Sequence, residues 1–239
     1  MSRGVIYSCA GRISFLNEAI NSAKSVKKFL PNIKICLFHA YDETKLNSVD
    51  TSIFDTIKKI DLDTEMDQRF TGHMRWFLTK LYAITESPFQ ETLFLDTDTE
   101  IKKPISSLFD ILKKFDIAIA PGPMTQPAID KYDPIIDIPT EFPELNTGVI
   151  LYKLNTKMKK FLTNWRDTFL HNKNNLYRPH GKGGEQVSLR YLLWHDDNIR
   201  MHILSTQGVP NMFNFRWGPL DKEFIFTNKI VIHHTRYRK

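Results

Sequence analysis

Short apolar runs alternate along this chain with longer segments that carry apolar residues at helical spacing. The runs over residues 4–10 and 33–38 have the length of buried strands, and residues 14–30 between them repeat apolar positions every three or four residues. Two parallel strands need a long crossover between them, and that crossover is usually a helix. The alternation therefore predicts the α/β class, with a largely parallel sheet flanked by helices.

The same alternation continues to the end of the chain. Further strands are predicted at 56–60, 92–95, 115–120, 148–152, 202–204 and 229–232, and further helices at 75–85, 106–114, 156–170 and 185–194. We expect a single domain over residues 1–239. The segments 121–143 and 172–184 are predicted as loops that are too long to be simple connections.

The composition is that of a globular protein with a moderate positive charge. The net charge is +6 and the basic residues are spread along the chain, which favours an acidic small molecule or a polyanionic surface over specific nucleic acid as partner. Cys9 and Cys36 lie in predicted strands and are expected to be buried, reduced thiols. Without a membrane-spanning run or a signal-peptide pattern, we expect a cytoplasmic protein that a partner could hold peripherally at a membrane.

Two carboxylates follow the apolar run Thr92 to Leu95, as Asp96-Thr97-Asp98. Strands of an α/β sheet end where ligand crevices open, and two carboxylates one residue apart repel each other unless a cation lies between them. A second such triplet, Asp61-Leu62-Asp63, has no strong apolar strand before it and is predicted to be a pair of solvated loop carboxylates. Asp96 and Asp98 are therefore the candidate ligands for Mn²⁺ or Mg²⁺.

The surroundings of this triplet resemble the GT-A-fold nucleotide-sugar glycosyltransferases, and most of all the retaining family that contains glycogenin, glycosyltransferase family eight. The segments that carry the resemblance occur in the family's order: 77–81 (FLTKL), 94–99 (FLDTDT), 120–123 (APGP), 145–149 (LNTGV), 184–186 (GEQ) and 232–233 (IH). They cover roughly residues 75–239, and the first 70 residues match in pattern only. The resemblance implies a Rossmann-like sheet with a small antiparallel element near the metal site. It also implies a nucleotide-binding half over 1–100 and a sugar- and acceptor-binding half over 101–239.

The resemblance assigns a metal and a diphosphate site. It implies that His233 completes the Asp96 and Asp98 metal site, and mixed histidine and carboxylate ligation fits Mn²⁺ better than Mg²⁺. Lys80 falls on the family lysine that contacts the donor phosphate, and the basic residues Arg236 and Lys239 fall where the diphosphate binds. The structural alternatives are a solvated lysine beside an apolar stripe for Lys80 and a frayed basic tail for the last four residues.

The remaining candidates concern the donor sugar and the base. Neutral hydrogen-bonding groups suit sugar hydroxyls, and the resemblance places Asn146, Thr147 and Gln186 there, with Asp96 and Thr97 near the ribose. Glu185 takes the position of a family aspartate under the reacting carbon, and Gly122 replaces another family aspartate. Lys80, Glu185 and Gln186 are the catalytic candidates. The end of the first strand is predicted to cradle the nucleobase, through Tyr7, Cys9 and Ala10.

These residues predict a metal-dependent glycosyltransferase that moves a hexose from a UDP-sugar to a carbohydrate or glycoconjugate acceptor. Retention is favoured, because no carboxylate pair at fixed spacing announces a general base. Inversion with Glu185 or an aspartate of residues 130–137 as base stays open, and so does a nucleotide-sugar-binding protein without transfer activity. A polyanion-binding protein that uses residues 236–239 is a further alternative. The sequence leaves the sugar epimer, the acceptor and the oligomeric state open.

Overall fold

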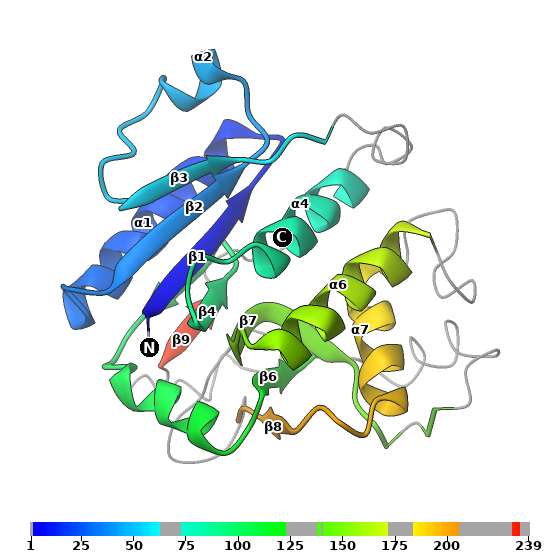
Figure 1. Ribbon diagram of the computed structural model, residues 1–239. Coiled ribbons are helices and arrows are strands. Elements are labelled where there is room, and N and C mark those ends of the chain that lie inside the picture. The colour runs from blue at the N-terminus through cyan, green and yellow to red at the C-terminus, as the bar shows by residue number, and fades with distance from the viewer. Residues whose placement is uncertain are drawn as a thin grey trace, which may run out of the picture.

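The computed structural model describes residues 2–62, 73–122, 138–139, 141–171, 184–205 and 231–234. Its first half forms parallel strands in the order β3-β2-β1-β4. These are β1 (Arg3–Cys9), β2 (Lys34–His39), β3 (Thr56–Lys59) and β4 (Glu91–Leu95). Val5 of β1 lies level with Ile35 on one side and Leu93 on the other. The predicted crossover helix is α1 (Ile13–Phe29), so the parallel sheet and its helical connection are confirmed (Figure 1).

The second half continues the same sheet with mixed directions. Strand β7 (Leu145–Lys153) runs antiparallel to β4, β6 (Ile117–Pro121) runs antiparallel to β7, and β8 (Met201–Ile203) pairs with β6 in parallel. The full order of the seven-stranded sheet is β3-β2-β1-β4-β7-β6-β8. One sheet thus contains strands from both halves of the chain. Most of its neighbouring strands pair in parallel, as predicted for the α/β class. The functional division at residue 100 stays a prediction.

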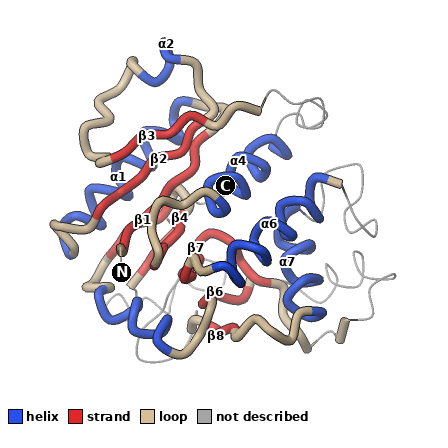
Figure 2. Tube along the Cα trace, in the orientation of Figure 1, coloured by secondary structure: helices blue, strands red, loops and turns tan. Residues whose placement is uncertain are grey.

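Helices cover both faces of the sheet (Figures 1 and 2). One face packs against α1 and the 3₁₀ helix η1 (Ser106–Lys113), and the other against α4 (His73–Thr85), α6 (Thr156–Leu170) and α7 (Gly184–His195). The alternation of side chains along a strand separates the two cores. Tyr7 and Cys9 of β1 belong to the α1 side, while their neighbour Ile6 belongs to the α4 side.

A separate two-stranded antiparallel sheet follows the carboxylate triplet. It pairs β5 (Thr99–Ile101) with β9 (Ile232–His234), with Glu100 opposite His233. The small antiparallel element that the family resemblance implies is therefore present. Its bounds differ from the sequence prediction, because β5 was not predicted and His233 lies inside β9 instead of following a strand that ends at residue 232. Short strands of three residues carry too little periodicity to be recognised from sequence.

Other bounds also differ from the prediction. Strand β7 begins at Leu145, three residues earlier than predicted, so Asn146 and Thr147 lie within it. The short helix α2 (Glu43–Leu46), capped by Asp42, was not predicted. Cys9 and Cys36 are buried free thiols, as expected, and burial raises the pKa of Cys36 to about 11. Among the described residues, no helix is long and apolar enough to cross a bilayer.

Candidate active site

The end of β4 and the start of β7 meet at one edge of the sheet. Because the two strands are antiparallel, the beginning of β7 lies beside the residues that leave β4. The backbone N–H of Asp96 donates to the carbonyl of Gly148 at 2.8 Å, and that of Thr99 donates back to the carbonyl of Asp96 at 3.2 Å. This geometry brings Asn146 and Thr147 next to the carboxylate triplet, although they follow it by about fifty positions in the chain.

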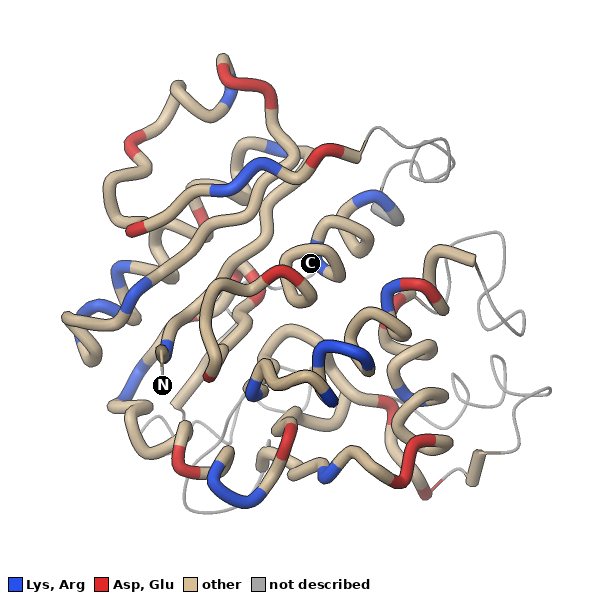
Figure 3. Tube along the Cα trace, in the orientation of Figure 1, with Lys and Arg blue, Asp and Glu red and all other residues tan. Residues whose placement is uncertain are grey.

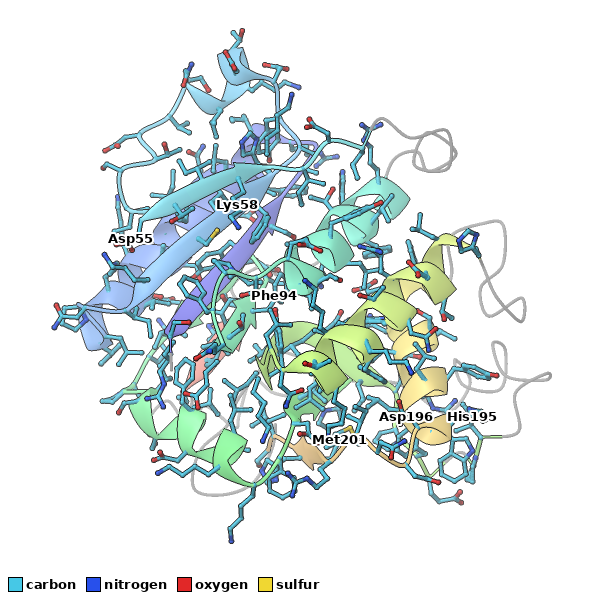
Figure 4. All side chains as sticks on the ribbon, viewed as in Figure 1. Asp55, Lys58, Phe94, His195, Asp196 and Met201 are labelled. Carbon is cyan, nitrogen blue, oxygen red and sulfur yellow. The ribbon has the colours of Figure 1, made fainter. Side chains whose placement is uncertain are left out.

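Lys80 is the centre of the site. Its ammonium nitrogen lies 2.8 Å from Oδ1 of Asp96 and 3.2 Å from Oε1 of Glu185. It also donates to the backbone carbonyl and the hydroxyl of Thr147, each at 3.2 Å. The ring of Phe94, which Figure 4 labels near the middle of the molecule, lies 5.1 Å from the ammonium. Elements α4, β7 and α7 and the residue after β4 thus converge on one buried cation.

The charge of Lys80 is held by its two carboxylate neighbours. Burial by itself would lower the pKa of Lys80, but the carboxylates of Asp96 and Glu185 outweigh burial and raise the pKa above its ordinary value. Lys80 and Glu185 are both buried, with 8% and 1% of their surfaces exposed. The predicted alternative of a solvated lysine is therefore wrong, because the side chain of Lys80 points from α4 into the protein interior.

Glu185 lies in the first turn of α7, where its backbone is fixed from a second helix. The indole N–H of Trp165 donates to the carbonyl of Glu185 at 2.9 Å, and the hydroxyl of Ser188 donates to the same carbonyl at 2.9 Å. The Thr147 hydroxyl donates to Oε1 of Glu185 at 2.5 Å. Among the described residues, its other oxygen, Oε2, has no hydrogen-bond partner although it is buried. A buried carboxylate oxygen in this state is suited to accept a hydrogen bond from a ligand.

Two predicted sugar-binding residues flank this cluster. Oδ1 of Asn146 accepts a hydrogen bond from the N–H of Gly148 at 2.9 Å, so this side chain shapes the start of β7. Gln186 follows Glu185 in the first turn of α7 and is half-buried. Trp165 and Ser188, which hold the start of α7, were not predicted from the sequence. They carry no local signal, because an indole on an apolar helix face normally indicates packing alone.

The candidate metal ligands lie on the triplet and on the small sheet. Asp98 lies in the turn that leads into β5, and His233 lies in β9, which pairs with β5 opposite Glu100. Asp96 instead forms its ion pair with Lys80. Within the described ranges, no three histidine, cysteine or acidic residues lie close enough together to hold a metal ion. The donor types fit a hard divalent cation, and the metal site of Asp96, Asp98 and His233 stays a prediction.

The first strand places its candidates differently from the prediction. The side chain of Tyr7 is completely buried and shares a hydrogen bond of 2.8 Å with Ser22. Cys9 is also buried, its thiol lies 3.7 Å from the carbonyl of Phe15, and its own carbonyl accepts from Ala40 at 3.0 Å. Both side chains face α1 and pack in the core. This burial contradicts a nucleobase contact by the Tyr7 side chain, whereas the predicted contact through the backbone of Cys9 or Ala10 stays a prediction. Ala10, at the end of the strand, is 6% exposed.

Several of the remaining candidates lie outside the described residues. Arg236 and Lys239 lie outside the described residues, and so do residues 130–137. Asp61 is exposed and pairs with Lys59 at 3.4 Å, as expected for a solvated loop carboxylate, while Asp63 lies outside the described residues. In the view of Figure 3, basic and acidic positions are scattered over the described trace and do not gather on one side.

Solved structures of glycosyltransferases superpose on nearly the whole chain. Galactosyltransferase LgtC, in complex with donor and acceptor sugar analogues, gives a TM-score of 0.66 at 15% identity over 97% of this chain and 86% of its own. This chain has the GT-A fold. Mouse xyloside xylosyltransferase 1 in its apo form gives 0.59 at 14% identity, over 98% of this chain and 97% of its own. The glycosyltransferase GlyE of Streptococcus pneumoniae TIGR4 gives 0.61 at 16% identity, over 100% of this chain and 55% of GlyE.

The similarity lies in the structure and not in the amino-acid sequence. The sequence matches no protein-family model and no curated protein. At identities of 14 to 16%, the shared property is the fold. The reaction has to be inferred from the residues at the sheet edge.

Proposed function

We propose that this protein is a metal-dependent glycosyltransferase that transfers a hexose from a UDP-sugar to a carbohydrate or glycoconjugate acceptor with retention. The observation that carries the proposal is the cluster of buried Lys80, Thr147 and Glu185 with the partly exposed Asp96, at the sheet edge of a GT-A fold. Ligands of α/β sheets bind at such edges, and a buried, charged cluster there is typical of a catalytic site.

Lys80 supplies a fixed positive charge beside the proposed site of the leaving diphosphate. Its ammonium is already oriented by Asp96 and Glu185 before any ligand binds. Preorganised charge of this kind is effective because it need not reorganise when negative charge develops in the transition state. Asp96 accordingly has a second role, which is to orient Lys80 in the ligand-free protein.

The proposed metal site uses Asp98 and His233, with Asp96 as the third ligand. A bound Mn²⁺ or Mg²⁺ would neutralise charge on the diphosphate. The carboxylate of Asp96 would therefore contact both the bound cation and the ammonium of Lys80. Arg236 and Lys239 are proposed to add positive charge at the diphosphate.

The donor sugar is proposed to lie against Glu185, Asn146 and Gln186. Oε1 of Glu185 is held by Lys80 and Thr147, which leaves the buried Oε2 to accept a hydrogen bond from a sugar hydroxyl. With Oε1 engaged by the Lys80 ammonium and the Thr147 hydroxyl, the side chain of Glu185 is fixed in place and oriented towards the proposed sugar. This environment favours retention over inversion with Glu185 as the base.

Removal of the metal tests the proposal directly. We expect EDTA to abolish UDP-sugar turnover by the full chain and Mn²⁺ to restore it, with UDP release and sugar transfer measured in parallel. Asp98→Asn should lose activity, because an amide is a poorer ligand than a carboxylate. Asp61→Asn changes the other Asp-x-Asp triplet in the same way and should leave activity unchanged, since Asp61 is exposed in a loop.

The outcomes separate the alternatives. Full turnover in EDTA would contradict the metal assignment. Saturable binding of UDP-sugars with neither transfer nor hydrolysis, over a panel of acceptors, would indicate the nucleotide-sugar-binding protein. Tight, salt-sensitive binding to polyanions with no response to UDP-sugars would indicate the polyanion-binding alternative.

A further inference from the structure

A polar stripe runs along α1 and faces the carboxylate triplet and β5. Glu18 Oε2 accepts a hydrogen bond from the Thr97 hydroxyl at 3.1 Å, and Ser25 Oγ accepts one from the Ile101 N–H at 2.9 Å. Between them, the hydroxyls of Ser22 and Thr99 lie 2.8 Å apart. We call Glu18, Ser22 and Ser25 the α1 polar stripe.

The order of the stripe matches the order of its partners. Positions 18, 22 and 25 share one face of α1. Their partners are the Thr97 hydroxyl in the turn before β5, then the Thr99 hydroxyl and the Ile101 N–H of β5. The helix and residues 97–101 therefore run side by side in the same direction, with a polar contact at each of these three positions.

The central contact belongs to a directed chain of buried hydroxyls. The Thr99 hydroxyl donates its single proton to the carbonyl of Asp96 at 2.8 Å, so it must accept from Ser22. Ser22 has then used its own proton and must accept from the Tyr7 hydroxyl, which lies 2.8 Å away. Burial raises the pKa of Tyr7, which therefore remains a donor. The chain runs from β1 through α1 to the backbone of Asp96.

We propose that the α1 polar stripe and Tyr7 are positioning residues that set the register of residues 96–101, and with it the distance between Asp98 and His233. Strand β5 is short and pairs with β9 over the three positions 99–101, so backbone pairing alone specifies its register weakly. A slip by one residue would turn Thr99 away from Ser22 and leave buried hydroxyls without partners, which costs free energy. The stripe excludes that slip.

The remainder of the buried face of α1 does not fix the register of a neighbouring strand through hydrogen bonds. Its buried residues outside the stripe are apolar, namely Leu16, Ala19, Ile20, Ala23 and Val26, and apolar packing tolerates small shifts better than hydrogen-bond pairs do. The buried polar side chain of α1, Ser22, lies where the helix passes β5. This inference rests on the proposed function, because it assigns the stripe a role in forming the proposed metal site.

The test compares metal binding by the full-length wild type with three variants. Ser22→Ala breaks the hydroxyl chain in its middle, and Tyr7→Phe removes only its first donor and is the milder change. Ser87→Ala is the matched control, because Ser87 also shares a buried hydroxyl bond with a threonine, Thr92, which lies near the start of β4 and away from the triplet at its end. Mn²⁺ affinity is measured by calorimetry without nucleotide, and amide exchange is followed over residues 96–101.

We expect Ser22→Ala to bind Mn²⁺ roughly 10-fold more weakly or worse, as is typical for loss of a partner that orients metal ligands. Amide exchange over 96–101 should accelerate in Ser22→Ala and, to a smaller extent, in Tyr7→Phe, while Ser87→Ala keeps wild-type values for both. If the wild type binds Mn²⁺ and the Ser22→Ala and Tyr7→Phe variants bind it equally well, the inference is overturned and the proposed function stands. If the wild type itself does not bind Mn²⁺, the metal assignment fails and the inference fails with it.

Discussion

At the scale of single residues, Lys80 contributes both to the stability of the fold and to the proposed reaction. Its ammonium is the cation that balances the carboxylates of Asp96 and Glu185 in a buried site. Removing one partner of a buried ion pair is much more harmful than replacing the whole pair, because the remaining charge has no compensation. A loss of activity in a Lys80 variant would therefore be ambiguous unless stability is measured as well.

We expect Lys80→Met to lower the free energy of unfolding by roughly 3–5 kcal/mol, the usual cost of leaving a buried charge alone. The double variant Lys80→Met/Glu185→Gln removes the buried carboxylate too and should regain most of that stability without regaining activity. Urea denaturation followed by circular dichroism measures the first quantity, and UDP-sugar turnover the second. A wild-type unfolding midpoint in the single variant would contradict the buried ion pair.

At the scale of elements, Asp55 connects the edge strand β3 with β2 and α1, and Figure 4 labels it. It lies directly before β3, accepts from the Ile35 N–H of β2 at 2.9 Å, and pairs with Lys34 at 2.7 Å and Lys27 of α1 at 3.1 Å. Burial would raise the pKa of Asp55, but these partners outweigh it and lower the pKa from 3.8 to about 2. The ionised carboxylate therefore stabilises the folded state.

This lowered pKa predicts how the stability depends on pH. The contribution of Asp55 is fully present above its unfolded pKa of 3.8 and is lost as the pH falls towards 2. Asp55→Asn should lower the free energy of unfolding by about 1–2 kcal/mol at pH 7, allowing for solvent screening. The difference from wild type should shrink below pH 4. Denaturation from pH 7 to pH 2 checks this, with the exposed Asp197→Asn as a control that changes little at any pH.

At the scale of the whole molecule, we expect the proposed transfer to proceed with retention. A UDP-α-hexose donor should give an α-linked product, because Glu185 is engaged by Lys80 and Thr147 and is unsuited to act as a general base. NMR of the first-formed product reports the anomeric configuration through its coupling constant. A β-linked product would mean that the GT-A fold is shared without the retaining chemistry, and Glu185→Gln would then be the first variant to examine.

Much of the fold could be predicted from the sequence, because its signals are local. The apolar residues of α1 recur at helical spacing, and the apolar runs that form β1, β2 and β4 are long enough to be recognised. The triplet Asp96-Thr97-Asp98 was identifiable because a strongly apolar, buried strand precedes it, whereas the strand before Asp61 and Asp63 is exposed. The residues of β5 lacked such a pattern, and the strand predicted at 229–232 overlaps β9 only at Ile232. Tyr7 was misplaced because a strand pattern does not reveal which of the two faces each side chain takes.

The sequence by itself determined the α/β class, the position of the triplet at a strand end and the set of candidate residues. Only the tertiary structure decided which candidates act together. Lys80 and Glu185 are 105 positions apart, and Lys80 and Thr147 are 67 apart, so their contacts exist only because α4 and α7 pack against the same face of the sheet beside β7. Likewise, Glu18, Ser22 and Ser25 are ordinary polar residues in the sequence and gain their partners from the course of β5 along α1. Local periodicity encodes elements, whereas a site is made of side chains that meet through packing between distant segments.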